Sequence, residues 1–181
     1  MRAGTILRRF EARDGREVTL RAPRWDDLDH MLEFINSLIE EGADITMNTK
    51  TTREKEAEWL SRLLTKVEND KAAVVVAEVD GRFVGQTEAE PKGGRMRHVG
   101  VLGIAIRDGY RDMGIGTELM IEVEPLAKKL EIEIMTLEVF ASNERARHVY
   151  EKAGYKEMGR LPRGARREDG YTDTISMYKE I

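Results

Sequence analysis

The chain of 181 residues lacks several features that often point to a function. It contains no cysteine, which excludes disulfides, thiolate metal sites and a cysteine nucleophile, and which fits a reducing compartment. Its three histidines show no metal-ligand spacing, so we expect no metal cofactor. No apolar run approaches the roughly 20 residues of a membrane helix, and the first residues lack the apolar centre of a signal peptide. We therefore expect a cytoplasmic protein with no membrane partner.

Positive charge is not in excess either, because 34 acidic side chains outnumber 30 basic ones and give a formal net charge of −4. The chain as a whole lacks the basic footprint of a nucleic-acid-binding protein, and we do not expect nucleic acid as a partner. Its hydrophobic fraction of 40% allows a sizeable core in a chain of this length. Without internal repeats or low-complexity linkers, residues 1–181 are expected to form a single domain.

The spacing of apolar residues predicts two strands, two helices, three strands, a helix, a strand, a helix and two strands. The expected strands are residues 5–11, 17–21, 72–79, 82–90, 98–106, 133–140, 155–161 and 171–179, and the expected helices start near residues 23, 52, 117 and 143. Pro125 lies inside the third helix, where it predicts a kink or an early end, and residues 162–167 are interpreted as a basic loop. A helix joins strands 98–106 and 133–140, which should make them parallel in an α+β or mixed α/β fold.

A glycine-rich turn, Arg111-Asp112-Met113-Gly114-Ile115-Gly116, joins the fifth expected strand to the third helix. Its glycines allow a tight turn and a close approach of the backbone to a ligand. The unpaired N–H groups at the start of the helix favour an anion, above all a phosphate. The turn is neither a P-loop, because no lysine follows Gly116, nor a dinucleotide fingerprint, because Leu119 takes the third glycine position. An ordinary strand–helix turn remains the alternative.

A second segment, Asn143 to Tyr155, favours a ligand-binding role for the glycine-rich turn over an ordinary strand–helix turn. Residues 103–119 resemble the pyrophosphate-binding motif of the GNAT acetyltransferases, and residues 137–155 resemble its companion motif, Asn-x-x-Ala-x-x-x-Tyr-x-x-x-Gly-Phe/Tyr. The end of the chain is similar to the branch of ribosomal-protein, polyamine and amino-acid acetyltransferases. The resemblance implies a mixed, mostly antiparallel central sheet with a splayed parallel pair of strands, flanked by helices.

The resemblance also implies acetyl-CoA as co-substrate. Its pantetheine arm would lie along Ile104, Ala105 and Ile106, and its pyrophosphate on the backbone amides of Arg111, Asp112, Met113, Gly114, Ile115, Gly116 and Thr117. The Arg111 guanidinium would add a charge-assisted contact to phosphate or would be solvated. The side chain of Asn143 would meet the pantetheine, cap the following helix, or do both.

For catalysis the resemblance implies direct attack of an amine on the acetyl carbonyl, with a backbone N–H near Ile104 or Ala105 stabilising the oxyanion. Tyr150 would protonate the departing thiolate, although a tyrosine on such a helix is often core with a satisfied hydroxyl. The base is less clear, because Val101 stands where many relatives have glutamate. The candidates are Glu88, His98, Glu138 and a water chain without a protein base.

Two charged segments bear on the acceptor. Residues 40–44 carry three carboxylates, which would attract a cationic amine or be solvated, and residues 160–167 carry four arginines, which would meet an acidic partner or water. We therefore expect a primary amine on a protein N-terminus, a polyamine or a small amino compound, and we leave a homodimer open. Two other functions remain as alternatives: an acyl-CoA-binding regulator without turnover, and a nucleotide- or RNA-associated module.

Overall fold

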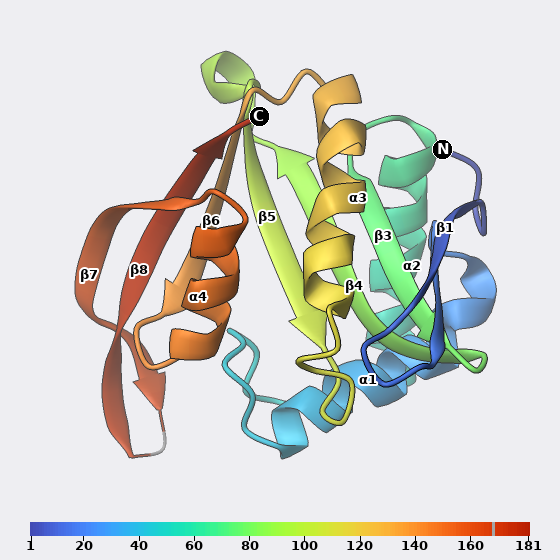
Figure 1. Cartoon of the computed structure of the whole chain (residues 1–181), viewed down its shortest axis with the longest axis horizontal. Helices are drawn as coiled ribbons and strands as arrows, with labels where there is room; N and C mark the ends of the chain where they lie inside the picture. Colours follow the sequence, from blue (N-terminus) through green and yellow to red (C-terminus); the bar gives the residue numbers. More distant parts are fainter. Residues whose placement is uncertain (168) are drawn as a thin grey trace.

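The computed structural model describes residues 1–167 and 169–181, which form a sheet with the strand order β1-β2-β3-β4-β5-β6-β8-β7 (Figure 1). The strands are β1 (Ile6–Glu11), β2 (Glu17–Arg21), β3 (Ala73–Val79), β4 (Arg82–Pro91), β5 (Val99–Ile106), β6 (Ile134–Phe140), β7 (Lys156–Arg167) and β8 (Gly170–Glu180). The α-helices are α1 (Leu28–Glu40), α2 (Arg53–Glu68), α3 (Ile115–Lys129) and α4 (Glu144–Lys152), and short 3-10 helices cover Trp25–Asp27 and Gly94–Met96. The pairing is antiparallel except between β5 and β6, which confirms the predicted mixed, mostly antiparallel sheet.

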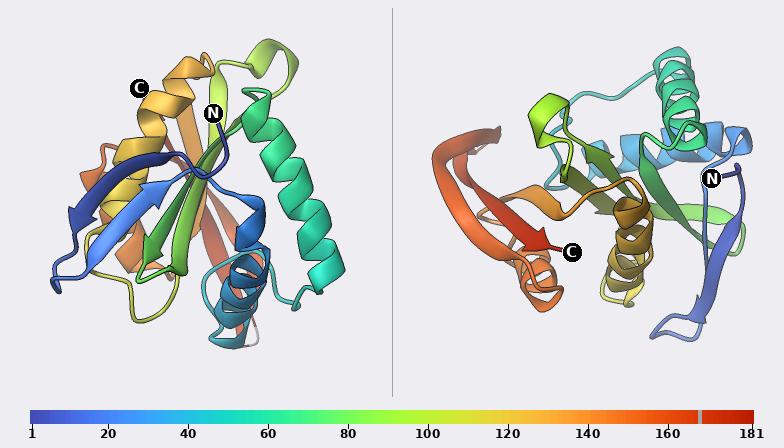
Figure 2. Two further views of the ribbon diagram at one scale, coloured as in Figure 1. Left: turned by 90° about the vertical axis from the view of Figure 1, so that its right-hand side faces the viewer. Right: turned by 90° about the horizontal axis from the view of Figure 1, so that it is seen from above.

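The helices divide between the two faces of the sheet (Figure 2). Helices α1 and α2 pack on one face, and α3 and α4 pack on the other. Strand β3 serves both cores, because Val75 packs in the cluster that contains α3, whereas Val74 and Val76 pack in the cluster that contains α1 and α2. Burial on both faces explains why β3 is a continuous apolar run rather than an alternating one.

The parallel pair of β5 and β6 is short. It covers three residue pairs, Val99–Ile134, Gly100–Met135 and Val101–Thr136, after which the two strands diverge (Figure 1). The hydroxyl of Thr136 donates to the carbonyl of Gly100 at 2.9 Å and adds a side-chain tie where the pairing ends. Beyond this point the sheet is open between β5 and β6, which confirms the predicted splayed pair.

A buried ion pair fixes the start of α1 on the sheet. Arg21 of β2 donates through Nη1 and Nη2 to the two carboxylate oxygens of Asp27 at 2.8 and 2.6 Å, and through Nε to Glu78 of β3 at 2.9 Å. The Arg21 side chain is 3% exposed and that of Asp27 is 0% exposed. The bidentate geometry satisfies both buried charges and ties α1 to β2 and β3.

The structure corrects two local expectations. Helix α3 does not end early at Pro125 but continues to Lys129, and the alternative expectation, a kink at Pro125, stays a prediction. The proline leaves the carbonyl of Ile121 without its helical N–H partner, and Ile121 lies on the exposed side of the helix, where water can take that place. Residues 162–167, expected as a loop, belong to β7, because a bulge between Leu161 and Ala165 absorbs Pro162 at the edge of the sheet.

Among the described residues no helix has the length and apolar character needed to cross a membrane.

We predict that Asp27→Ala lowers the free energy of unfolding by about 3 kcal/mol, because it leaves the buried Arg21 guanidinium without its main partner. Asp29→Ala is the matched control, since Asp29 pairs with Arg53 at 2.7 Å between side chains that are 70% and 60% exposed. Its loss should stay below about 1 kcal/mol. Urea unfolding of the two variants measures both values, and equal losses would contradict the structural role of Asp27.

Candidate active site

The gap between β5 and β6 exposes main-chain groups of β5. The N–H of Arg107 donates to the carbonyl of Val84 at 2.8 Å, so the main-chain groups of odd-numbered residues in β5 face β4. Because these groups alternate along a strand, the main-chain groups of the even-numbered residues face the gap. The N–H of Leu102 still belongs to the last parallel pair with β6, so the groups beyond it are the carbonyl of Leu102 and the main-chain groups of Ile104 and Ile106.

The three residues expected to hold the pantetheine are therefore not equivalent. The N–H and carbonyl of Ile104 face the gap, whereas those of Ala105 face β4. The carbonyl of Ile106 accepts a hydrogen bond from Nε of Arg111 at 2.9 Å. Ile104 is thus the residue with both main-chain groups available to an extended ligand in the gap. The pantetheine contact itself stays a prediction.

The glycine-rich turn lies at the end of β5 and opens α3. Gly114 precedes the helix with φ of 88°, in the left-handed region that favours glycine, and no side chain caps the helix there. The N–H of Glu118 donates to the carbonyl of Gly114 at 3.1 Å, which leaves the amides of Ile115, Gly116 and Thr117 as the helix's free donors. This geometry suits a phosphate group, which supports the predicted role of these amides without testing it.

The Arg111 side chain is held by other parts of the protein. Besides Ile106, its guanidinium contacts Glu41 at the end of α1 and lies 3.7 Å from Asp108. A phosphate contact by this guanidinium, as predicted, would require it to leave Glu41. The pair instead links the turn to the segment between α1 and α2.

Asn143 immediately precedes α4 and Tyr150 lies on it, on the same side of the sheet as α3. The Asn143 side chain accepts from the N–H of Ala146 at 3.0 Å, so it caps α4, and its predicted contact with the pantetheine stays untested. Tyr150 is 9% exposed, and its ring packs edge-on against Tyr155 at 6.1 Å. Burial raises the pKa of Tyr150 to about 12, so its hydroxyl is protonated at neutral pH. Among the described residues its hydroxyl has no hydrogen-bond partner, which differs from a core tyrosine with a satisfied hydroxyl.

Glu88 lies on the opposite face of the sheet, on the side of α1 and α2. It pairs with Gly103 of β5, and its Oε1 would lie 3.5 Å from a Cβ built on that glycine, so the carboxylate rests against the β5 backbone. Burial raises the pKa of Glu88, the charge of Glu90 raises it further, and Lys66 opposes the shift. The other candidate bases are placed differently: His98 is exposed before the start of β5, and Glu138 is exposed on β6.

The acidic segment after α1 is ion-paired within the protein. Glu40 pairs with Lys50, Glu41 with Arg111, and Asp44 with Arg167 near the end of β7. Arg167 also donates to the hydroxyl of Ser142 at 3.3 Å, ahead of α4. The acidic and basic segments noted in the sequence thus bind partly to each other, and none of the three carboxylates is left as a free negative charge.

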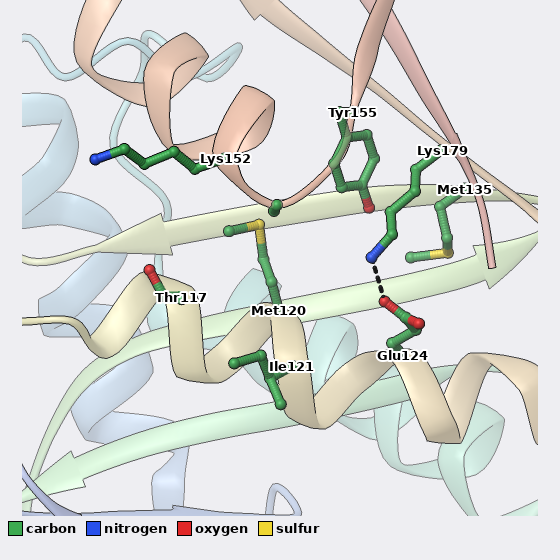
Figure 3. A pocket seen from close by; sticks show the side chains of 9 residues that line it. Thr117, Met120, Ile121, Glu124, Met135, Lys152, Tyr155 and Lys179 are labelled. Carbon is green, nitrogen blue, oxygen red and sulfur yellow. Dashed lines mark hydrogen bonds and ion pairs between the residues drawn. The ribbon is translucent and has the colours of Figure 1, made fainter.

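A cavity of about 180 Å³ lies between α3 and the end of α4 (Figure 3). Its floor holds an ion pair between Lys179 Nζ and Glu124 Oε2 at 2.5 Å, beside the hydroxyl end of Tyr155. The cavity is lined by Thr117, Met120, Ile121, Glu124, Met135, Lys152, Ala153, Tyr155 and Lys179.

Among the described residues no group of three or more His, Asp or Glu side chains could hold a metal ion.

Comparison with known proteins identifies this arrangement. A family model described as the acetyltransferase (GNAT) family matches residues 35–155, well over half of the chain. The chain belongs to the GNAT acetyltransferase family. This confirms the family and the enzyme class, an N-acetyltransferase, predicted from the two sequence motifs.

Individual relatives agree with the family. An N-alpha-acetyltransferase of Sulfurisphaera tokodaii is 28% identical over 158 residues, which cover 82% of this chain and 86% of that protein. The crystal structure of a GNAT acetyltransferase from Streptococcus pneumoniae matches with a TM-score of 0.81 and 25% identity, over 91% of this chain and 99% of that one. A phosphinothricin acetyltransferase from Sinorhizobium meliloti, solved with acetyl-CoA, shares the fold with a TM-score of 0.79 and 21% identity, over 91% and 88% of the two chains.

Proposed function

We propose that this GNAT acetyltransferase transfers an acetyl group from acetyl-CoA to the amino terminus of a protein by direct attack in a ternary complex. One observation carries the proposal. The sheet opens between β5 and β6, with a buried phenol, Tyr150, on one face and a partly buried carboxylate, Glu88, on the other. A thioester in the gap would thus have a proton donor on one side and a proton acceptor on the side from which an amine can approach.

The donor site fits acetyl-CoA, which supplies a reactive acetyl thioester when bound. Ile104 presents its N–H and carbonyl to the gap, as an extended pantetheine arm requires. The free amides of Ile115, Gly116 and Thr117 suit its pyrophosphate. Gly116 keeps the turn close to β5, because a Cβ there would lie 3.1 Å from Cδ1 of Ile106.

Each catalytic residue has one task. Glu88 accepts a proton from the acceptor ammonium, and its raised pKa brings it closer to the pKa of an amine. The N–H of Ile104 stabilises negative charge on the acetyl oxygen, because it is fixed by the strand and needs no reorganisation. Tyr150, protonated at neutral pH, gives its proton to the departing sulfur.

The acceptor assignment rests on charge and on one relative. Glu40, Glu41 and Asp44 are each paired with a basic side chain, so this segment offers no free cluster of negative charge that would hold a polyamine. The Sulfurisphaera tokodaii relative is named an N-alpha-acetyltransferase. Both observations favour a protein N-terminus over a polyamine.

A thiol-release assay tests the function directly. With acetyl-CoA as donor, we expect turnover on peptides with free N-termini and much slower turnover on spermidine. Free amino acids form the third group of acceptors in the panel. Acetyl-CoA binding without thiol release on any acceptor would replace the proposal with a regulatory acyl-CoA-binding function.

We predict that Gly114→Val weakens acetyl-CoA binding at least about tenfold, because a branched residue is strained at φ of 88° and would displace the free amides. Gly93→Val is the matched control, since Gly93 has φ of −82° in a turn with open space around its Cβ position. Calorimetric titration gives both affinities, and thermal unfolding checks that both variants fold. An unchanged affinity of Gly114→Val would argue against the donor site.

For the proton donor, we expect Tyr150→Phe to lower kcat by on the order of 100-fold with little change in acetyl-CoA affinity. Tyr155→Phe removes the hydroxyl of the neighbouring buried ring and should leave kcat near that of the wild type. Single-turnover kinetics ensure that the chemical step is measured. Equal effects of the two substitutions would point to packing instead of proton transfer.

The raised pKa of Glu88 predicts a pH dependence. As a base, Glu88 must be deprotonated, so kcat/KM should rise with pH through a pKa above the ordinary glutamate range. Glu88→Gln should remove this limb and lower kcat by on the order of 100-fold. Glu90→Gln should move the limb to lower pH, because it removes a charge that raises the Glu88 pKa. A limb that stays in place in Glu90→Gln would assign it to another group, such as the acceptor amine.

A further inference from the structure

Two arginines from distant parts of the chain meet at Asp112 in the glycine-rich turn. Nε of Arg145, in the first turn of α4, lies 2.9 Å from Oδ1 of Asp112. Nη1 of Arg13, at the tip of the hairpin between β1 and β2, donates to the carbonyl oxygen of Asp112 at 3.3 Å. The turn is therefore bordered by a cation from α4 and another from the N-terminal hairpin.

The hairpin is docked on the turn by further contacts, which fix the position of Arg13. Its own N–H donates to the carbonyl of Met113 at 3.2 Å. Arg16 donates to the carbonyl of Gly109 at 3.3 Å, and its guanidinium stacks over the ring of Tyr110 at 4.4 Å. These contacts bring basic side chains to the rim of the turn rather than leaving the hairpin free in solvent.

The negative charge of the Asp112 side chain is unfavourable in a site that binds an anion. It is a carboxylate, 74% exposed, beside helix amides that favour a negative ligand, and its φ of 62° lies in the left-handed region. Its charge would repel a phosphate unless a cation offsets it. Arg111 does not provide that cation, because its guanidinium is held by Ile106 and Glu41. Arg145 does, and it is itself 49% exposed and open to a ligand.

We propose that Arg145 and Arg13 bind the 3′-phosphate of CoA, with Arg145 exchanging the Asp112 carboxylate for the phosphate. The inference rests on the proposed use of acetyl-CoA. The pyrophosphate is served by the amides inside the turn, whereas the two arginines lie outside them, at a rim that solvent reaches. A dianionic phosphate on the adenosine end of the cofactor has the charge that two arginine donors fit.

The experiment compares two donors, acetyl-CoA and acetyl-dephospho-CoA, which differ in the 3′-phosphate alone. Calorimetric titration gives the dissociation constant of each for the full-length wild type and for Arg145→Ala, Arg13→Ala and Asp112→Asn. Arg53→Ala is the matched control, because Arg53 forms a similarly exposed ion pair with Asp29 at 2.7 Å on another part of the surface. Thermal unfolding confirms that each variant is folded.

We expect the wild type to bind acetyl-CoA on the order of tenfold more tightly than acetyl-dephospho-CoA, because charge-assisted hydrogen bonds to the phosphate are lost with it. Arg145→Ala and Arg13→Ala should each reduce this ratio, and Arg53→Ala should not. Asp112→Asn should tighten acetyl-CoA binding, because it removes a competing charge and asparagine tolerates the left-handed conformation.

Three results would overturn the assignment. Equal affinities of the wild type for the two donors would remove the 3′-phosphate as a ligand. Parallel weakening of both donors in Arg145→Ala would give Arg145 a role in shaping the turn. Weaker acetyl-CoA binding in Asp112→Asn would make the ion pair itself the important contact. Failure of the wild type to bind either donor would instead contradict the proposed function, so the two failures are distinguishable.

Discussion

The site depends on one structural constraint: the hydrogen bonding between β5 and β6 ends after a short stretch. After three residue pairs the strands diverge, and β5 continues with main-chain donors and acceptors that face a gap. Such groups are costly when buried without partners, so they need water or a ligand. The rest of the structure supports this opening: Thr136 adds a hydrogen bond where the pairing ends, and α3 and α4 pack beside the gap on one face.

The charged side chains around the opening are largely paired with one another. The acidic segment after α1 is ion-paired with the glycine-rich turn through Glu41 and Arg111. It is also ion-paired with the end of β7 through Asp44 and Arg167. These contacts join the proposed donor and acceptor sides of the site. They also leave little net charge for a polycation, which is why the proposed acceptor is a protein N-terminus.

Local features of the sequence predicted most of the fold. Strand and helix positions followed from apolar spacing, and the tight turn before α3 followed from its glycines, of which Gly114 adopts a positive φ in the structure. The errors concern two prolines whose effect depends on where they lie in the folded structure. Pro162 suggested a loop but lies in an edge strand, where its missing N–H costs no pairing. Pro125 does not end α3, because the carbonyl that loses its N–H partner lies on the exposed side of the helix.

The site was predicted less completely, because contacts between distant residues leave no local signal. Arg111 and Glu41 are 70 positions apart, and Arg13 and Asp112 are 99 apart, so neither pair could be read from spacing. Ile104 and Ala105 could not be distinguished until the pairing of β5 with β4 showed which one faces the gap. Tyr150 came from the family motif, whereas the position of Glu88 against Gly103 required the structure.

Amide hydrogen exchange, with and without acetyl-CoA, tests the role of the open strand most directly. The N–H of Ile104 faces the gap, so it should exchange rapidly in the free protein and slowly when acetyl-CoA is bound. The N–H groups of Gly103 and Ala105 face β4 and should be protected in both states. Protection of Ile104 in the free protein, or no change at saturating acetyl-CoA, would contradict the account.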